Sequence, residues 1–202
     1  MEKNRQGLLH IYCGDGKGKT SAAVGMAVRA AGCGMKVLVI RFLKTENSGE
    51  VEVLRSIPGI TVPPCERTFG FVFRMTEEQK QEAALYYQSR FEAAAKKAVQ
   101  GQYDLLILDE ILASCNYGMV RETSVVEFLQ NRPEKLEVVL TGRNPSETFL
   151  ELADYFCQEN NDCINQLKLV YQTLRALNVP SLSPKLVRVI YELKTLVYFG
   201  VY

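Results

Sequence analysis

Residues 13–20, "CGDGKGKT", match part of the pattern of a phosphate-binding loop, G-x-x-x-x-G-K-[ST]. The G-K-T at 18–20 supplies the second half of the pattern. Cys13 stands where the first glycine is expected, and Gly14 comes one residue later than the pattern requires. The first question is therefore whether this loop binds a nucleotide in the usual way, in another way, or not at all.

A glycine turn between a strand and a helix can surround an anion with backbone N–H groups, with the positive end of the helix behind them. Lys19 would neutralise phosphate charge, Lys17 adds a second cation, and the Thr20 hydroxyl would reach a Mg²⁺ ion. The alternative is a glycine turn without a ligand. The alternating glycines together with K-G-K-T favour nucleotide binding.

Two carboxylates, Asp109 and Glu110, follow the apolar run 105–108. Acidic side chains at the end of a buried strand hold magnesium in many nucleotide-binding folds. A carboxylate just past a strand can instead cap the next helix. Next to the glycine loop, the metal-binding interpretation is favoured, and the candidate ligands are Asp109, Glu110 and Thr20.

Two arginines are candidate phosphate contacts. Arg143 follows Thr141 and Gly142 at the end of another predicted strand, where its planar guanidinium could pair with a phosphate. A turn arginine bonded to a carbonyl is the competing hypothesis. Arg29 lies about two and a half helical turns beyond Thr20, and it either faces the site or is a solvated surface residue.

The stretch "TFGFVFR" (68–74) contains three alternating phenylalanines, Phe69, Phe71 and Phe73. In a strand these side chains would share one face. The pattern alone favours a core strand. The other interpretation is an apolar platform for a large flat ligand.

Apolar periodicity predicts elements that place these motifs at one edge of a sheet. Strands are expected at 8–13, 36–42, 60–62, 103–110 and 136–143. Helices are expected at 19–32, 76–101, around 125–130 and at 145–155, the second of them with a Thr76–Gln79 capping box. Strands alternating with helices predict an α/β fold with a central, mostly parallel sheet, whose ligands bind at the carboxyl ends of the strands.

Composition excludes several classes of function. The chain has 202 residues and a net charge of +1, which gives no general attraction to nucleic acid or membranes. It lacks an apolar run long enough for a membrane span, and its polar start does not resemble a signal peptide, so we expect a cytoplasmic protein. Six scattered cysteines are then expected as reduced thiols, and with one histidine, His10, a zinc site is not favoured.

The alternation of strands and helices stops near residue 157. The segment 157–202 is expected to form two helices interrupted by Pro180 and Pro184, with apolar stripes at helical spacing. We therefore predict an α/β domain over 1–156 and a helical C-terminal segment of uncertain role over 157–202.

The motifs "GDGKGKT", "LLILDE", "TGR" and "LADY", in this order and spacing, resemble those of the ATP:corrinoid adenosyltransferases of the P-loop type. The resemblance covers about residues 7–156. Loops of that family also carry G-[ND]-G-K-G-K-T with a late first glycine. The resemblance implies a RecA-like P-loop fold and a reaction in which the 5′-deoxyadenosyl group of ATP passes to the reduced cobalt of a corrinoid while triphosphate leaves.

The resemblance also implies roles for single residues. Thr20 and Glu110 would contact Mg²⁺ with Asp109 beside them, and Phe71 and Phe73 would lie against the corrin, with Phe73 where the family has tryptophan. No side chain would act as a nucleophile, because cob(I) is itself the nucleophile. The implied ATP-binding residues are Gly14, Asp15, Gly16, Lys17, Gly18, Lys19, Thr20 and Arg29, and Arg143 is added to them from its place at a strand end.

The chain departs from the family after "LADY". It lacks the usual terminal segment K-x-H-x-[FY], a departure that bears on the corrinoid site and on oligomer contacts. Part of the tail is weakly similar to recombination-mediator O proteins, but about 30 residues without a basic face do not indicate DNA repair. A homodimer and a reductase that supplies electrons to cobalt are the expected partners. The alternatives are a P-loop phosphohydrolase or kinase, and an ATP-binding module with a degenerate corrinoid site.

Overall fold

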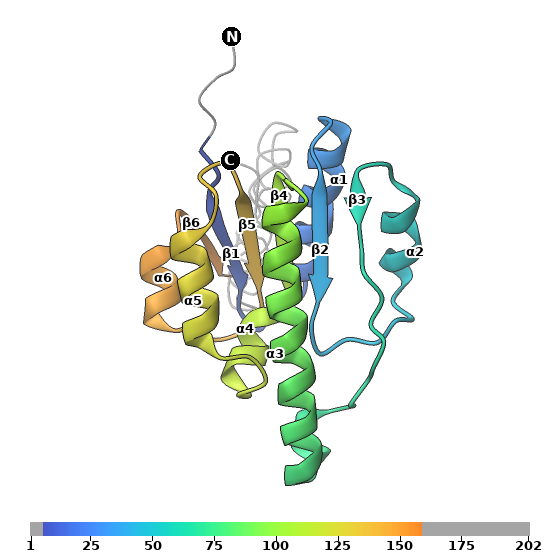
Figure 1. The fold of residues 1–202 in the computed structure, drawn as a ribbon, viewed down its shortest axis with the longest axis vertical. Helices are drawn as coiled ribbons and strands as arrows, with labels where there is room; N and C mark the ends of the chain where they lie inside the picture. The colour runs from blue at the N-terminus through green and yellow to red at the C-terminus, as the bar shows by residue number, and fades with distance from the viewer. Residues whose placement is uncertain (1–5, 159–202) are drawn as a thin grey trace, which may run out of the picture.

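A computed structural model describes residues 6–158, in which six strands form one sheet (Figure 1). The strand order is β3-β2-β4-β5-β1-β6, and every hydrogen-bonded pair is parallel. The predicted α/β fold with a parallel sheet is therefore confirmed. The strands are β1 (Leu9–Cys13), β2 (Val37–Arg41), β3 (Ile60–Thr61), β4 (Leu105–Asp109), β5 (Glu137–Thr141) and β6 (Tyr155–Gln158).

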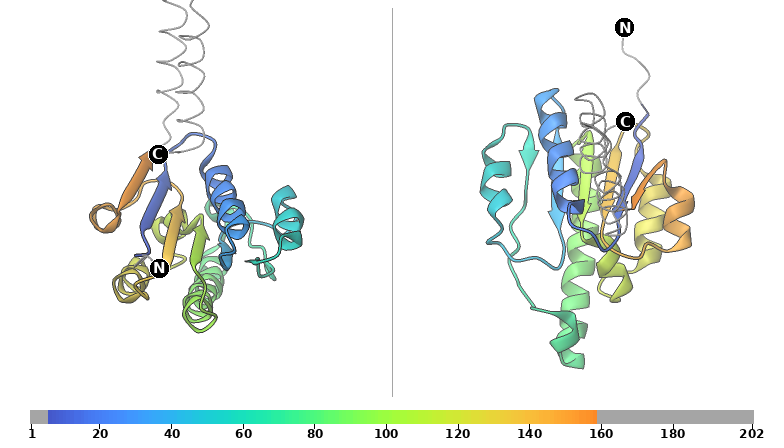
Figure 2. Two further views of the ribbon diagram at one scale, coloured as in Figure 1. Left: turned by 90° about the horizontal axis from the view of Figure 1, so that it is seen from above. Right: turned by 180° about the vertical axis from the view of Figure 1, so that it is seen from behind.

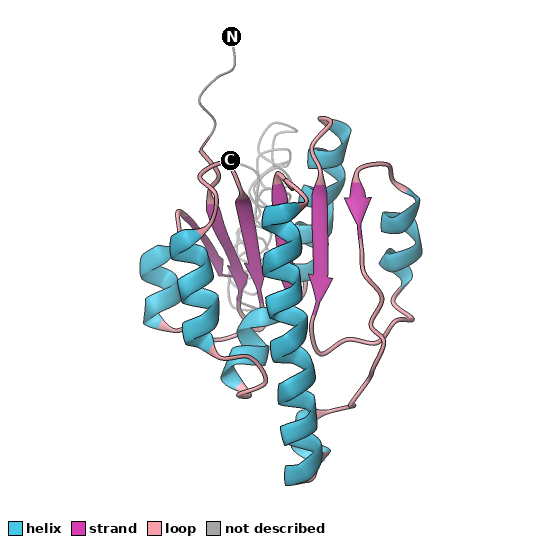
Figure 3. Cartoon of the chain, in the orientation of Figure 1, coloured by secondary structure: helices cyan, strands magenta, loops and turns pink. Residues whose placement is uncertain are grey.

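Helices cover both faces of this sheet, as Figure 3 shows by colour. The helices are α1 (Lys19–Gly32), α2 (Gly49–Ser56), α3 (Glu77–Gln100), α4 (Ile111–Asn116), α5 (Glu122–Asn131) and α6 (Glu147–Leu152), with a 3₁₀ turn at Val72–Arg74. Seen from above, α1 and α2 lie on one side of the sheet and α3 and α5 on the other (Figure 2).

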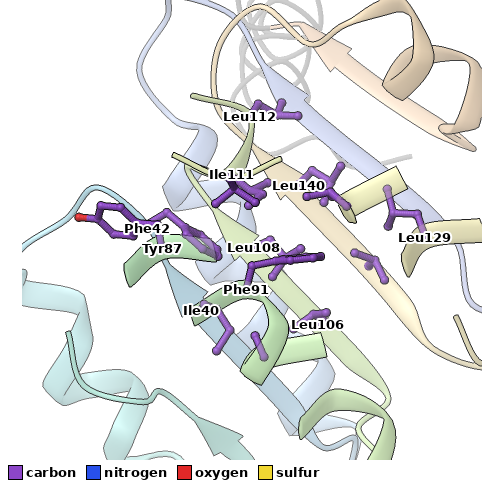
Figure 4. Packing of buried hydrophobic residues seen from close by; sticks show 14 of the residues in the cluster. Ile40, Phe42, Tyr87, Phe91, Leu106, Leu108, Ile111, Leu112, Leu129 and Leu140 are labelled. Carbon is purple, nitrogen blue, oxygen red and sulfur yellow. The ribbon is translucent and has the colours of Figure 1, made fainter. Parts of the chain in front are cut away.

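Two apolar cores, one on each face, fix this arrangement. Successive residues of a strand point to opposite faces, so Val39 packs with α1 and α2 while Ile40 packs under α3. On the α3 side, Phe91 lies against Leu106 and Leu108 of β4 (Figure 4). Strands buried on both faces read as continuous apolar runs, which is why β2 and β4 were recognisable in the sequence.

Several predicted elements are confirmed closely. The helix α3 begins after Thr76, whose hydroxyl accepts from the Gln79 N–H, and the Gln79 side chain completes the expected capping box. The helix α1 covers the predicted 19–32, and its residues Ala23 and Ala27 are buried. The short strand near residue 60 is present as β3.

Other elements differ from the expectations. The expected loop at 44–54 contains the start of α2, and α4 stands directly after β4, where only a later helix was expected. The segment 68–74 is not a strand, so the interpretation of Phe71 and Phe73 as core-strand residues is wrong. The predicted helix at 145–155 ends at Leu152, and β6 follows it beside β1.

The strand β6 reaches Gln158, two residues past the expected domain end at 156. The rest of the expected helical segment lies outside the described residues, and the domain division stays a prediction. Within residues 6–158, no helix has the length and apolar character needed to cross a bilayer.

Candidate functional site

The glycine loop joins the end of β1 to the start of α1. Gly14 and Gly18 adopt φ values of 107° and 124°, a region in which a side chain is strained, so the loop needs glycine at both positions. No side chain caps the N-terminus of α1. The first N–H groups of this helix therefore remain available to an anion, as a phosphate-binding loop requires.

Lys19 is folded back onto this loop. Its ammonium group donates to the carbonyls of Gly14 and Gly16, each at 2.7 Å, and the residue is only 7% exposed. Asp15 and Lys17 are exposed at the loop surface. Lys19 thus braces the loop from within, while Lys17 projects toward solvent.

Asp109, at the end of β4, lies at the centre of a polar cluster that it forms with Thr20, Lys44 and Thr141. Its buried Oδ1 accepts hydrogen bonds from the Thr20 hydroxyl at 3.0 Å and from the Thr141 hydroxyl at 2.7 Å. Its Oδ2 pairs with the Lys44 ammonium at 2.5 Å. The carboxyl ends of β1, β2, β4 and β5 therefore meet at Asp109, as the convergence of motifs predicted.

Glu110 directly precedes α4, at its N-cap position, and adopts a left-handed conformation with φ 64°. Its backbone N–H donates to the Thr141 hydroxyl at 2.9 Å, and its side chain makes no capping hydrogen bond. The helix-capping hypothesis for this carboxylate is therefore not supported. Its side chain is half-buried at the same edge of the sheet as Asp109.

The two arginines lie in different places. Arg143 is next to the loop, where its Nε is 3.6 Å from Asp15 Oδ1, and both side chains are exposed. Arg29 is an exposed residue of the last turn of α1. It stands about 13 Å from Thr20 along the helix axis, so the structure does not bring it to the loop.

Phe71 and Phe73 form an exposed aromatic pair. Their side chains are 66% and 77% exposed, and their rings stack with centroids 5.4 Å apart. The Arg74 guanidinium lies over both rings. Phe69 differs from them, because it packs against Tyr86 and Tyr87 at the core. Segment 72–74 precedes α3 at the end of the molecule toward which the strands point (Figure 1).

Sequence reasoning missed two contacts of the polar cluster. It did not identify Lys44, and it did not predict that the Thr141 hydroxyl donates to Asp109. Both follow or end a predicted strand, at the sheet edge where the site was expected. Arg41, at the end of β2, is also buried, and it holds the following loop through the Thr45 carbonyl at 2.6 Å and the Ser48 hydroxyl at 2.7 Å.

The chain is similar in sequence to several known proteins. A corrinoid adenosyltransferase of Pseudomonas aeruginosa is 31% identical over 153 residues, 75% of this chain and 74% of its own length. One from Escherichia coli K12 is 32% identical over 153 residues, 75% of this chain and 76% of its own. One from Salmonella typhimurium is 29% identical over the same length.

Two family models match the chain. The model of the recombination protein O C-terminal region matches 148–202, which overlaps α6 and β6 and otherwise lies outside the described residues. The model described as ATP:corrinoid adenosyltransferase BtuR/CobO/CobP matches 5–162 and contains the whole described sheet. On this match, and on relatives about 31% identical over three quarters of their length, the chain belongs to the ATP:corrinoid adenosyltransferase family.

Proposed function

We propose that this protein transfers the 5′-deoxyadenosyl group of ATP to the reduced cobalt of a corrinoid and releases triphosphate. The observation that carries the proposal is the glycine loop, with its positive φ values and uncapped helix N-terminus, in a chain of this family. Incubation of the protein with ATP and chemically reduced corrinoid tests it. The expected products are a light-sensitive adenosyl-corrinoid and one triphosphate per turnover.

The reaction needs no nucleophile from the protein. The electron pair of cobalt(I) attacks C5′ of ATP, a Co–C bond forms, and the C5′–O bond to the triphosphate breaks. Burial raises the pKa of the Cys115 thiol, in α4, to about 12, so this cysteine stays protonated. The residues of the chain contribute by orienting ATP and by stabilising the negative charge of the leaving triphosphate.

A magnesium ion fits the cluster around Asp109. Within residues 6–158 no group of three or more His, Cys, Asp or Glu side chains could hold a metal alone. Magnesium typically takes one or two protein oxygens, with phosphate oxygens and water completing its shell. Asp109 and Thr20 offer such oxygens, and a cation, the Lys44 ammonium, already lies between them. Bound there with ATP, the ion would neutralise triphosphate charge.

Glu110→Gln should lower the magnesium-dependent part of ATP affinity by roughly tenfold, because the substitution removes a negative charge at this edge of the sheet. Its melting temperature should stay close to that of the parent, because the side chain makes no capping bond. Calorimetric titration of ATP with magnesium and with chelator measures the difference. A variant that melts at a clearly lower temperature yet keeps its full magnesium dependence would restore the capping hypothesis.

The stacked pair Phe71–Phe73 is the proposed contact for the corrin. Single exposed apolar side chains are common, but adjoining ones that form a patch can mark a binding surface. The corrin is a broad ring that can rest on two stacked phenyl rings. The 72–74 turn lies beyond the carboxyl ends of the strands, on the side of the sheet where ATP would bind. No observation favours a phosphohydrolase or a kinase over this reaction.

Partners and location follow from the same proposal. A separate reductase would supply the electrons that bring cobalt to its reduced state, and we propose a homodimer that works in the cytoplasm. Arg143, which already lies beside the loop, remains a proposed phosphate contact. Light scattering on the purified protein tests the dimer.

Truncation after Gln158 should leave ATP affinity within about twofold of the full chain. This fragment keeps β6, which is hydrogen-bonded to the strand that carries the glycine loop. Truncation after Asp154 is the matched comparison. It removes β6, exposes the edge of β1, and should reduce solubility.

Calorimetry with Mg-ATP and light scattering on both fragments measure these effects. Loss of ATP binding in the fragment that ends at Gln158 would show that residues 159–202 are integral to the nucleotide-binding domain. The boundary near 157 would then be wrong.

A further inference from the structure

Lys44 lies between the two side chains that would hold magnesium. Its Nζ is 2.5 Å from Asp109 Oδ2 and 2.8 Å from Thr20 Oγ1. The Asp109 side chain is 3% exposed and that of Lys44 20%. Nothing in the reaction described above assigns Lys44 a role.

Both oxygens present electron pairs to this ammonium group. The Thr20 hydroxyl donates its proton to Asp109 Oδ1 at 3.0 Å, so the lone pairs of Thr20 are free to accept from Lys44. These are the atoms with which a hydroxyl and a carboxylate bind magnesium. An ammonium group and a dication cannot share them, because like charges this close repel strongly in a partly buried site.

We propose that Lys44 occupies the magnesium position in the nucleotide-free protein, and that Mg-ATP displaces its ammonium group onto the triphosphate. The proposal rests on the magnesium site of the proposed function. Before ATP arrives, Lys44 gives the buried Asp109 carboxylate the counter-charge that burial demands. After the exchange, the lysine adds positive charge to the leaving group.

The loop that carries Lys44 is anchored, so the exchange moves a side chain and leaves the backbone in place. Arg41 holds the Thr45 carbonyl and the Ser48 hydroxyl. Glu46 accepts from the Cys65 N–H at 2.8 Å, a bond that lowers the pKa of the Glu46 carboxyl, and it also pairs with Arg55. The flexible stem of lysine allows its ammonium group to swing while its Cα stays fixed.

The displacement makes metal binding depend on ATP. A metal ion that binds without ATP must displace the Lys44 ammonium group, and it gains only two protein oxygens as ligands, those of Thr20 and Asp109. Metal that arrives with ATP brings phosphate oxygens, and these same phosphates attract the released lysine. Wild-type protein should therefore bind Mn²⁺, a substitute for Mg²⁺, much more weakly without ATP than with it.

Lys44→Met should bind Mn²⁺ roughly tenfold more tightly than wild type in the absence of nucleotide, because no ammonium group competes for Asp109. Electron paramagnetic resonance of free Mn²⁺ measures this affinity directly. Lys36→Met, which removes the same charge from an exposed residue before β2, is the matched control and should bind like wild type. Unchanged or weaker Mn²⁺ binding by Lys44→Met would overturn the proposal.

Thermal melting supplies a second readout. Without metal, Lys44→Met should melt lower than wild type, and Mg²⁺ alone should restore its stability, whereas wild type should respond little. Lys44→Gln keeps a hydrogen-bond donor to Asp109 but carries no charge, and it replaces Lys44→Met in the test if that variant does not fold. It should also bind Mn²⁺ more tightly than wild type. Asp109→Asn added to either variant should abolish the gain.

The two proposals fail in different ways. If wild type with ATP binds Mn²⁺ but the Lys44 variants show no gain without ATP, the exchange is wrong and the magnesium site stands. If wild type binds no Mn²⁺ even with ATP, the magnesium site and the exchange are both wrong. Adenosyl transfer, measured separately, then decides whether the enzyme works without this metal site.

Discussion

Lys19→Ala should weaken ATP binding by about a hundredfold or more. The residue follows the glycines of the loop and stands at the N-terminus of α1, where phosphates would bind. In the described structure its ammonium group satisfies the carbonyls of Gly14 and Gly16, so it is already directed into the loop. The substitution removes both the charge that would meet the triphosphate and the brace that shapes the loop.

Calorimetric titration with Mg-ATP measures the loss, and circular dichroism confirms that the variant is folded. Lys17→Ala is the matched comparison, because Lys17 is an exposed lysine of the same loop and should cause a smaller loss. If Lys19→Ala binds ATP as tightly as the parent protein, the loop is a structural turn. The departure from the usual pattern at Cys13 would then mark a loop that binds no nucleotide.

The elements predicted best from the sequence are those whose position depends on residues within the element itself. The capping box at Thr76 and the glycine at 101 set the ends of α3 locally. The strand β4 is apolar on both faces, and its burial follows from that pattern. The site was predictable to the same degree, because the carboxyl ends of adjacent parallel strands must meet at one edge of a sheet.

The missed elements depend on contacts distant in sequence. The strand β6 is an exposed edge strand whose pairing with β1 joins Tyr155 to His10, so its own pattern carries no sign of burial. The position of Lys44 depends on how the loop after β2 folds back toward Thr20. The pairing of β6 depends on the order of the strands, and the position of Lys44 depends on the path of the loop. The periodicity of the sequence predicts neither strand order nor loop path.

The alternating phenylalanines show a limit of periodicity. Phe69, Phe71 and Phe73 alternate as they would in a half-buried strand. In the structure Phe69 packs at the core, and a 3₁₀ turn over 72–74 leaves Phe71 and Phe73 exposed. Apolar side chains that are buried in a core and those that receive a ligand can show the same alternating pattern. Only the backbone conformation of the segment distinguishes the two cases.

Phe71→Ala and Phe73→Ala should each reduce adenosyl transfer by roughly tenfold, and the double variant by about a hundredfold. Each substitution removes a large apolar surface from the proposed contact with the corrin. ATP affinity should stay within about twofold of the parent, because neither side chain belongs to the glycine loop. The measurement is the initial rate of adenosyl-corrinoid formation at several corrinoid concentrations, with ATP saturating.

The exposure of the two rings makes this test selective. Truncation of a core phenylalanine costs about 3–5 kcal/mol of folding stability, whereas side chains 66% and 77% exposed have little packing to lose. Melting temperatures should therefore barely change. Val53→Ala, which trims an exposed apolar side chain of α2, is the control and should leave the rate unchanged. If the phenylalanine variants melt early yet transfer adenosyl groups at the parent rate per folded molecule, the pair is structural and the corrin binds elsewhere.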